Sequence, residues 1–233
     1  MKKLYIAIPS HDNRCHFGMT FGLLEMYHAL SVRGIVMHPA LHAKTSAARG
    51  RNNLISDFLD TDADKLLFCD TDVVIKSHQN EIVNMVLRDK MIVGGLYPHK
   101  TKELRFCLNT IPGEEPIKEG PDRGLMKVDK IGTGLLCLKR EAIQHIIKTF
   151  PETEYFDDDP NSQGKRRWGI CQETVVFDPQ YGKNRWMTDD WYLCHLARKS
   201  GLDIWADTTF YCQHEGDFVF PMTEPEVKSF DSK

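Results

Sequence analysis

Short apolar stretches alternate with longer segments of helical spacing through the first hundred residues. Four apolar stretches have the length and composition of buried β-strands, at residues 4–8, 35–38, 66–69 and 91–97. Segments between them repeat apolar side chains at the spacing of a helix face, at residues 22–30, 46–59 and 81–87. This alternation predicts an α/β fold with a mostly parallel, doubly wound central sheet and helices on both of its faces.

The second half of the chain is less regular. Apolar stretches predict further strands at residues 104–109, 125–128, 130–138, 202–206 and 209–214, and helices at residues 141–150 and 189–199. The third of these strands is interrupted by Gly132 and Gly134, and the second helix ends near Gly201, a residue type that favours the position past a helix end. Residues 151–186 are rich in Asp, Gly, Lys, Arg and Pro, which predicts a long mobile segment.

The composition limits the class of protein. A chain of 233 residues with 41% hydrophobic and 27% charged residues is typical of a globular domain. We expect one domain over residues 1–233, with halves at 1–100 and 101–220 and a tail at 221–233. The net charge of −3 provides no overall basic surface for nucleic acid.

Cysteine usage and hydropathy bear on the compartment. Seven scattered cysteines without a C-x-x-C spacing favour a reducing, cytoplasmic location and argue against a zinc site built from cysteines. The apolar stretch at residues 4–8 is too short for a signal peptide, and no apolar stretch reaches the length of a membrane helix. We therefore expect no membrane span.

Two carboxylates, Asp70 and Asp72, directly follow the buried-strand pattern of residues 66–69. The D-x-D spacing occurs four times in the chain, but the other three occurrences lie in a polar turn or an acidic loop. Ligands of open α/β sheets bind at the carboxyl ends of strands, so this position favours a functional role over turn capping. Such a pair can hold Mg²⁺ or Mn²⁺ and, through the cation, a diphosphate.

Charged residues at two predicted helix starts are further candidates. Arg49 and Arg51 follow Ser46, a plausible N-cap, at the helix end where the dipole disfavours cations. An anionic ligand and a solvated helix face explain these arginines equally well. Asp189 and Asp190 begin the helix at 189–199, where the dipole accounts for one acid and leaves the second available as a general base.

Three weaker candidates depend on their surroundings. Residues 132–134, Gly-Thr-Gly, allow close approach of a ligand or form a β-bulge, and the two readings are equally supported. His214 becomes a candidate metal ligand only because carboxylates are already proposed near it in the fold. The basic and aromatic run at residues 165–168 favours a solvated loop over contact with an acidic or nucleic-acid acceptor.

Taken in order, these motifs resemble those of GT-A-fold glycosyltransferases, the small family-2-like and Anp1-like members of bacterial, phage or large-virus type. The resemblance extends from about Leu4 to Gly216 and implies a Rossmann-like sheet, a nucleotide-sugar-binding half at 1–100 and a smaller mixed acceptor half at 101–220. The motifs that carry it are Ile8-Pro9-Ser10, Ala48-Arg49-Gly50-Arg51-Asn52, Leu67-Phe68-Cys69-Asp70-Thr71-Asp72-Val73, Val93-Gly94-Gly95-Leu96-Tyr97-Pro98-His99-Lys100, Val128-Asp129-Lys130-Ile131-Gly132-Thr133-Gly134, Thr188-Asp189-Asp190-Trp191-Tyr192-Leu193-Cys194 and His214-Glu215-Gly216.

The resemblance implies a role for each matched residue. Asp70, Asp72 and His214 would bind Mn²⁺ or Mg²⁺, and Asp190 would be the catalytic base of an inverting enzyme. The donor would be a nucleoside-diphosphate sugar, most simply a UDP-sugar. The remaining residues expected around the donor and its sugar are Pro9, Ser10, Arg51, Thr71, Lys100, Gly132, Thr133, Gly134 and Asp189.

The sequence departs from the family pattern at two places. The first acid of the second acidic motif is Asp189 rather than Glu, and a Gly-Arg pair follows Arg49, so either Arg49 or Arg51 can be the arginine that faces the donor. Residues 151–186 would form a lid or acceptor loop. The sugar, the stereochemical outcome, the oligomeric state and the acceptor (a glycan, lipid, protein or modified nucleic acid) stay open.

Other classes of protein share part of the pattern. A haloacid-dehalogenase-like phosphatase would use Asp70 as its nucleophile, but that motif normally ends the first strand of the core, and two predicted strands come earlier here. A nucleotidyltransferase would need a Gly-rich, Arg-containing loop after the first strand, which this chain lacks. A non-catalytic sugar-nucleotide-binding protein is the third alternative, and it would not need Asp190 as a base.

Overall fold

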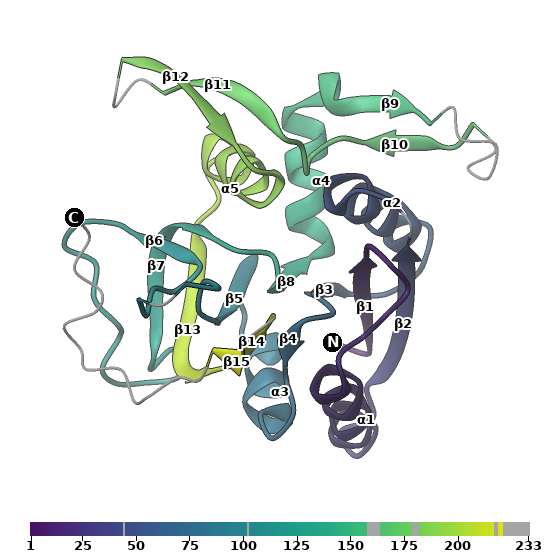
Figure 1. The fold of residues 1–233 in the computed structure, drawn as a ribbon, viewed down its shortest axis with the longest axis vertical. Helices are drawn as coiled ribbons and strands as arrows, with labels where there is room; N and C mark the ends of the chain where they lie inside the picture. Colours follow the sequence, from purple (N-terminus) through teal and green to yellow (C-terminus); the bar gives the residue numbers. More distant parts are fainter. Residues whose placement is uncertain (44, 102, 158–163, 179–181, 217–218, 221–233) are drawn as a thin grey trace.

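The computed structural model describes residues 1–43, 45–101, 103–157, 164–178, 182–216 and 219–220 (Figure 1). The predicted tail at 221–233 lies outside the described residues. No helix in the described part is both long and apolar enough to cross a membrane. All seven cysteines are free thiols, and five of them are buried.

An eight-stranded mixed sheet forms the centre of the fold, in the order β2-β1-β3-β8-β5-β13-β7-β6. Its strands are β1 (Lys3–Ser10), β2 (Val36–Ala43), β3 (Lys65–Cys69), β5 (Ile92–Leu96), β6 (Leu108–Thr110), β7 (Leu125–Ile131), β8 (Leu135–Lys139) and β13 (Ile204–Tyr211). Strands β2, β1 and β3 are parallel, as are β5 and β13, while β8 lies antiparallel between β3 and β5. The predicted α/β fold is confirmed.

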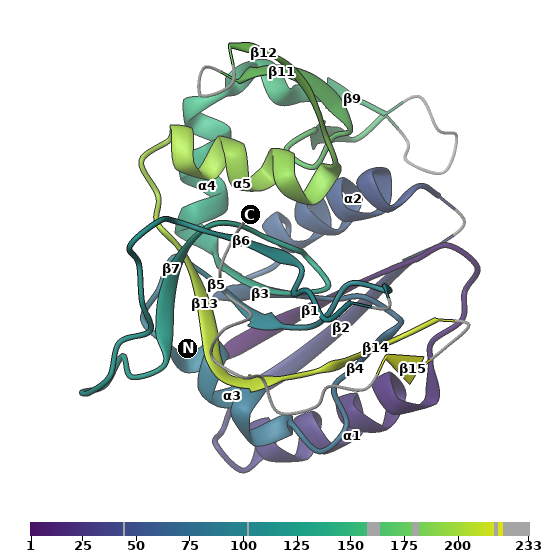
Figure 2. The ribbon, with the colours of Figure 1, turned by 60° about the vertical axis from the view of Figure 1, so that its left-hand side comes forward.

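Helices cover both faces of the sheet (Figure 2). They are α1 (Phe17–Ser31), α2 (Ala47–Leu59), α3 (Gln79–Leu87), α4 (Arg140–Thr149) and α5 (Asp189–Lys199). Alternate residues of β1 point to opposite faces: Tyr5 packs in the core with α2, α4 and α5, whereas Leu4 and Ile6 pack in the core with α1 and α3. This doubly wound arrangement leaves the carboxyl ends of β1 and β3 at the same sheet edge.

Local sequence signals set several helix ends. Ser46 caps α2 as predicted, because its Oγ accepts a hydrogen bond from the backbone N–H of Arg49 at 3.3 Å. Gly201 follows α5 with a φ of +84°, a conformation that a residue without Cβ adopts at little cost.

The predicted single strand over 130–138 is wrong. The chain instead leaves β7 at Ile131, turns through Gly132 to Gly134, and returns as β8 in a different part of the sheet. The reason is that strand pairing places β7 beside β13 and β8 between β3 and β5, which local hydrophobicity does not encode.

Residues 151–186 also contain more regular structure than their composition predicts. A 3₁₀ turn at Pro151–Thr153 is followed by two antiparallel hairpins, β9 (Glu154–Phe156) with β10 (Arg166–Trp168) and β11 (Thr174–Asp178) with β12 (Lys183–Met187). Figure 1 shows both hairpins at the top of the molecule, beyond α2 and α5.

The basic run at 165–168 is partly structural. Arg167 is 3% exposed and donates to Asp57 Oδ1 at 2.9 Å, and Arg166 pairs with Glu154 across the hairpin. Because these two arginines are paired within the protein, residues 165–168 are better explained as part of the hairpin structure than as a surface that binds nucleic acid.

Candidate functional site

A small three-stranded sheet brings the first acidic motif and His214 together. It consists of β4 (Val73–Val74), β14 (Gln213–Glu215) and β15 (Val219–Phe220), with Val73 opposite His214 in the register. The backbone N–H of Glu215 also donates to the carbonyl of Asp72 at 2.8 Å. Backbone pairing therefore places His214 beside Asp72, as the resemblance implies.

Asp72 accepts from two cationic or potentially cationic side chains. Its Oδ2 accepts from the Lys100 ammonium at 2.5 Å, and its Oδ1 lies 3.5 Å from His214 Nε2. Partial burial by itself raises the pKa of Asp72, but hydrogen bonding and charge from His214 and Lys100 outweigh it and hold the pKa well below its usual range. Asp72 is thus an ionised carboxylate ready to face a cation.

The orientation of His214 suits a metal ligand. Its Nδ1 lies 2.8 Å from the carbonyl oxygen of Pro98, and because a carbonyl only accepts, Nδ1 carries the proton. With Nδ1 engaged by the Pro98 carbonyl, Nε2 is the nitrogen that faces Asp72, and a cation between the two side chains would be bound by the deprotonated Nε2, the arrangement in which a second partner fixes a metal-binding imidazole. The ring packs edge-on against Tyr97, with centroids 5.3 Å apart. An imidazole nitrogen and a carboxylate oxygen are suitable donors for Mn²⁺.

The third expected ligand, Asp70, is engaged elsewhere. Both of its carboxylate oxygens lie 2.8 Å from Arg51 Nη2, and its backbone N–H donates to the carbonyl of Gly134 at 2.9 Å. Among the described residues, no group of three or more histidine, cysteine or acidic side chains is arranged to hold a metal ion. The residues that fit a cation here are Asp72 and His214.

Arg51 joins the two acidic motifs. It is 6% exposed, contacts Asp70 through Nη2, and donates through Nη1 to Asp189 at the start of α5. Burial opposes its charge, but Asp70 and Asp189 outweigh that effect and raise the pKa of Arg51. Arg49 points elsewhere and pairs with Asp157. The arginine that faces the inside of the site is therefore Arg51.

Asp190 lies in the first turn of α5, next to Asp189. Its Oδ1 accepts hydrogen bonds from the Thr188 hydroxyl and from the backbone N–H of Trp191, the latter at 2.8 Å. Burial raises the pKa of Asp190, and the charge of Asp189 adds to that effect, while the hydrogen bond from Thr188 opposes it. A carboxylate with a raised pKa is a better proton acceptor near neutral pH.

The three acids converge on one region around Cys107 and Tyr97. Burial, followed in order of size by the charges of Asp190, Asp70 and Asp72, raises the pKa of the Cys107 thiol to about 12. The acids of both motifs therefore lie within electrostatic range of a single side chain. Neither Tyr97 nor Cys107 had been assigned a role from sequence, although Tyr97 lies within one of the matched motifs.

The glycines at 132 and 134 have a packing reason. A Cβ on Gly132 would overlap the Tyr97 hydroxyl, and a Cβ on Gly134 would lie 2.8 Å from Tyr97 Cζ. The Tyr97 Oη accepts from the backbone N–H of Gly134 at 2.8 Å, and Thr133 between them is 1% exposed. The turn is therefore built around the Tyr97 ring, and its predicted contact with the sugar stays a prediction.

The expected nucleoside-binding residues lie at the carboxyl end of β1. Ser10 is 5% exposed, and its hydroxyl donates to the carbonyl of Arg14 at 3.3 Å. The loop that follows Pro9 and Ser10 reaches the other motif, because the backbone N–H of His16 donates to the carbonyl of Thr71 at 3.0 Å. The structure thus brings the β1 end and the acidic motif after β3 to the same edge.

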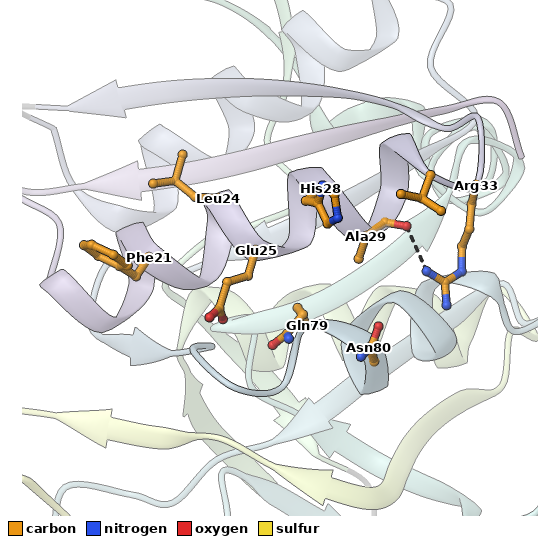
Figure 3. A pocket seen from close by; sticks show the side chains of 9 residues that line it. Phe21, Leu24, Glu25, His28, Ala29, Arg33, Gln79 and Asn80 are labelled. Atoms are coloured by element: carbon orange, nitrogen blue, oxygen red, sulfur yellow. Dashed lines mark hydrogen bonds between the residues drawn. The ribbon is translucent and has the colours of Figure 1, made fainter.

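A groove of about 680 Å³ lies elsewhere, between α1 and α3 (Figure 3). It is lined on α1 by apolar and polar side chains, including Phe21, Leu24 and Glu25, and on α3 by Gln79 and Asn80. None of the predicted site residues lines it.

No protein-family model matches the sequence, and no curated protein matches it. Among solved structures, A197 from STIV matches with a TM-score of 0.53 and 18% identity, over 93% of this chain and 87% of A197. A glycosyltransferase involved in glycosylation of the major capsid of PBCV-1 gives 0.36 and 12%, over 69% of this chain and 72% of that protein. TarS 1–349 from S. aureus gives 0.41 and 10%, over 91% of this chain and 59% of the solved TarS fragment. The chain shares the α/β fold of A197.

Proposed function

We propose that the protein is a metal-dependent glycosyltransferase that moves a sugar from a nucleoside-diphosphate sugar to an acceptor hydroxyl, with Asp190 as base. The observation that carries the proposal is the convergence of two acidic motifs with opposite electrostatics. Asp72, paired with His214, is held ionised, whereas Asp190 is biased toward binding a proton. Such divergent environments mark carboxylates with different chemical roles.

Asp72 and His214 form the cation-binding side of the proposed site. They would hold Mn²⁺ or Mg²⁺, which when bound offsets the charge that develops on the leaving diphosphate. The Lys100 ammonium, now on Asp72, lies on a flexible stem and would turn to a diphosphate oxygen. Pro9, Ser10 and Thr71, at the neighbouring strand ends, would hold the nucleoside of the donor, a UDP-sugar in our proposal.

Asp190 forms the other side. Its carboxylate takes the proton of the acceptor hydroxyl while the oxygen forms a bond to the anomeric carbon and the bond to the diphosphate breaks. The product is the glycosylated acceptor with inverted configuration, and the nucleoside diphosphate leaves. The departing diphosphate generates an oxocarbenium-like centre of the kind known from glycoside hydrolysis.

The β11–β12 hairpin is our candidate for the acceptor side, because β12 ends two residues before α5 and its acids. Val175 and Trp186 oppose each other across the hairpin, and their side chains are 57% and 64% exposed. Phe177, on the same face as Val175, is 58% exposed. An apolar and aromatic surface of this kind suits the face of a sugar ring or another amphipathic acceptor group.

The geometry disfavours the phosphatase alternative. A nucleophilic Asp70 would need a free carboxylate oxygen, but both oxygens contact Arg51 at 2.8 Å. Hydrolysis of p-nitrophenyl phosphate that requires Mg²⁺ and disappears in Asp70→Asn would nevertheless restore that reading.

A calorimetric screen of nucleotide sugars with and without Mn²⁺ tests the proposal. We expect one nucleoside diphosphate to bind, with tighter binding when Mn²⁺ is present, and the corresponding sugar nucleotide to be consumed when an acceptor is supplied. In Asp190→Asn donor binding should persist and turnover should disappear, which separates a transferase from a non-catalytic binding protein. Failure of every nucleoside diphosphate to bind would contradict the proposal.

A further inference from the structure

We infer that Arg51 is a positioning residue that anchors the inner acid of each motif, Asp70 and Asp189, and thereby aims the outer acids, Asp72 and Asp190, at the substrates. The inference rests on the proposed function for what the outer acids do. The anchoring itself follows from contacts that involve no ligand.

A single guanidinium connects three separate elements. Arg51 projects from α2, Asp70 follows β3, and Asp189 begins α5. The planar fork of arginine can donate from different nitrogens to two carboxylates at once, which the ammonium of a lysine cannot do with the same fixed geometry. Two negative charges and one positive charge are thereby held in the interior, with Arg51 6% exposed.

Both inner acids are paired with Arg51. Asp70 uses both carboxylate oxygens on Arg51, and the Asp189 side chain is 11% exposed. Arg51 itself is too deeply buried to reach a donor in the open part of the site. This argues for an indirect role in place of the direct donor contact that the resemblance implies.

The outer acids differ from the inner acids in their partners. The Asp72 side chain is 28% exposed and contacts Lys100 and His214. Either of these side chains can leave Asp72 and bind another partner. In the described part of the chain, Asp190 accepts hydrogen bonds through Oδ1 alone. Its Oδ2 can therefore accept a proton from a substrate. Because each outer acid follows an anchored acid by one or two residues, fixing the inner pair restricts where the outer pair can point.

Thermal unfolding tests the anchor. Arg51→Met leaves the buried Asp189 and the partly buried Asp70 without their cation, and we expect the Tm to fall by about 10 °C. Replacing the whole cluster, in Arg51→Met/Asp70→Asn/Asp189→Asn, removes the uncompensated charge and should recover at least half of that loss. As a matched control, Arg198→Met removes a half-exposed arginine paired with Asp129 and should shift the Tm by about 2 °C or less. A single variant as stable as the parent, or a triple variant no better than the single, would overturn the anchor.

The aiming role needs a readout that stability alone does not move. In the folded triple variant, Mn²⁺ alone, followed by electron paramagnetic resonance, should bind about 10-fold more weakly than in the parent, because Asp72 is no longer fixed. Arg51→Lys should lower kcat about 10-fold and change the donor KM less than about 3-fold. Unchanged Mn²⁺ affinity in the triple variant, or a raised KM with unchanged kcat in Arg51→Lys, would overturn the aiming role.

The two proposals fail separately. If the parent binds no nucleoside diphosphate, the proposed function is wrong, and the Tm pattern still decides whether Arg51 anchors the acids. If the parent transfers a sugar but the Tm pattern is absent, the anchor is wrong and the transferase assignment stands.

Discussion

Asp72 and Asp190 each follow an acid held by Arg51, yet their surroundings shift their pKa values in opposite directions. Asp72 lies beside Lys100 and His214, which lower its pKa despite partial burial. For Asp190, burial and the charge of Asp189 raise the pKa and outweigh the opposing hydrogen bond from Thr188 and the charge of Arg51. The comparison teaches that residue type does not assign the role of these acids, whereas the charges around each carboxylate do.

The change with the largest expected effect removes the proposed base, Asp190. Asp190→Asn keeps an oxygen that can accept from Thr188 and Trp191, so the start of α5 should be preserved. We expect kcat to fall about 1,000-fold while donor affinity stays within about 2-fold, since a general base acts in the transition state. Steady-state kinetics with direct titration of UDP and Mn²⁺ would measure both. Comparable loss in donor affinity would mean that Asp190 binds substrate instead.

Asp72→Asn tests the other acid of the comparison. Removing its charge should weaken Mn²⁺ binding about 100-fold and lower turnover at limiting Mn²⁺ by a similar factor. Because the cation would be held jointly, His214→Ala should weaken Mn²⁺ binding in the same direction. Isothermal titration with Mn²⁺ measures the effect, and Asp62→Asn, in the polar turn with the same D-x-D spacing, provides the control. If Asp62→Asn and Asp72→Asn behaved alike, the proposed metal site would be wrong.

The parts of the fold that the sequence predicts correctly are those with strong local patterns. The strand at Lys65–Cys69 is buried at every position, and Ser46 and Gly201 act at the helix ends where they were expected. The hairpins within 151–186 escaped prediction because their strands are only three to five residues long, so cross-strand pairing defines them and hydrophobic periodicity does not.

Predictions of which candidate-site residues lie together were also correct where a sequence motif carried them and incomplete where three-dimensional packing decided the contact. The resemblance predicted that His214 lies near Asp72, and the structure places their side chains 3.5 Å apart. It did not predict that Arg51 would engage both oxygens of Asp70, because a contact between a helix and a strand end depends on packing in three dimensions. Tyr97 was missed for a related reason, since its importance comes from the glycines that make room for it.

The charges of Asp70 and Asp190 both act on Tyr97, so a change in packing around its ring tests the same region with a smaller expected effect. In Gly132→Ala the new methyl overlaps the Tyr97 hydroxyl, and we expect a destabilisation of about 2 kcal/mol in chemical denaturation. Adding Tyr97→Phe removes that hydroxyl and should recover part of the loss, although Gly134 N–H then loses its acceptor, at about 1 kcal/mol. Additive losses in the double variant would show that the two residues do not contact each other.

The smallest effect is the pH dependence of stability, and it has opposite signs for the two acids. Because the folded-state pKa of Asp72 is lowered, its contribution is present above the unfolded pKa, near 3.8, and is lost as the pH falls through the folded value. The folded-state pKa of Asp190 is raised, so its contribution is present below the unfolded pKa and is lost as the pH rises through the folded value. Asp190→Asn, which stays uncharged, should therefore have a higher Tm than the parent at pH 7, with a smaller advantage at pH 4. Asp72→Asn should show a deficit at pH 7 that shrinks toward low pH, and identical pH profiles for the two variants would mean that the two carboxylates share one environment.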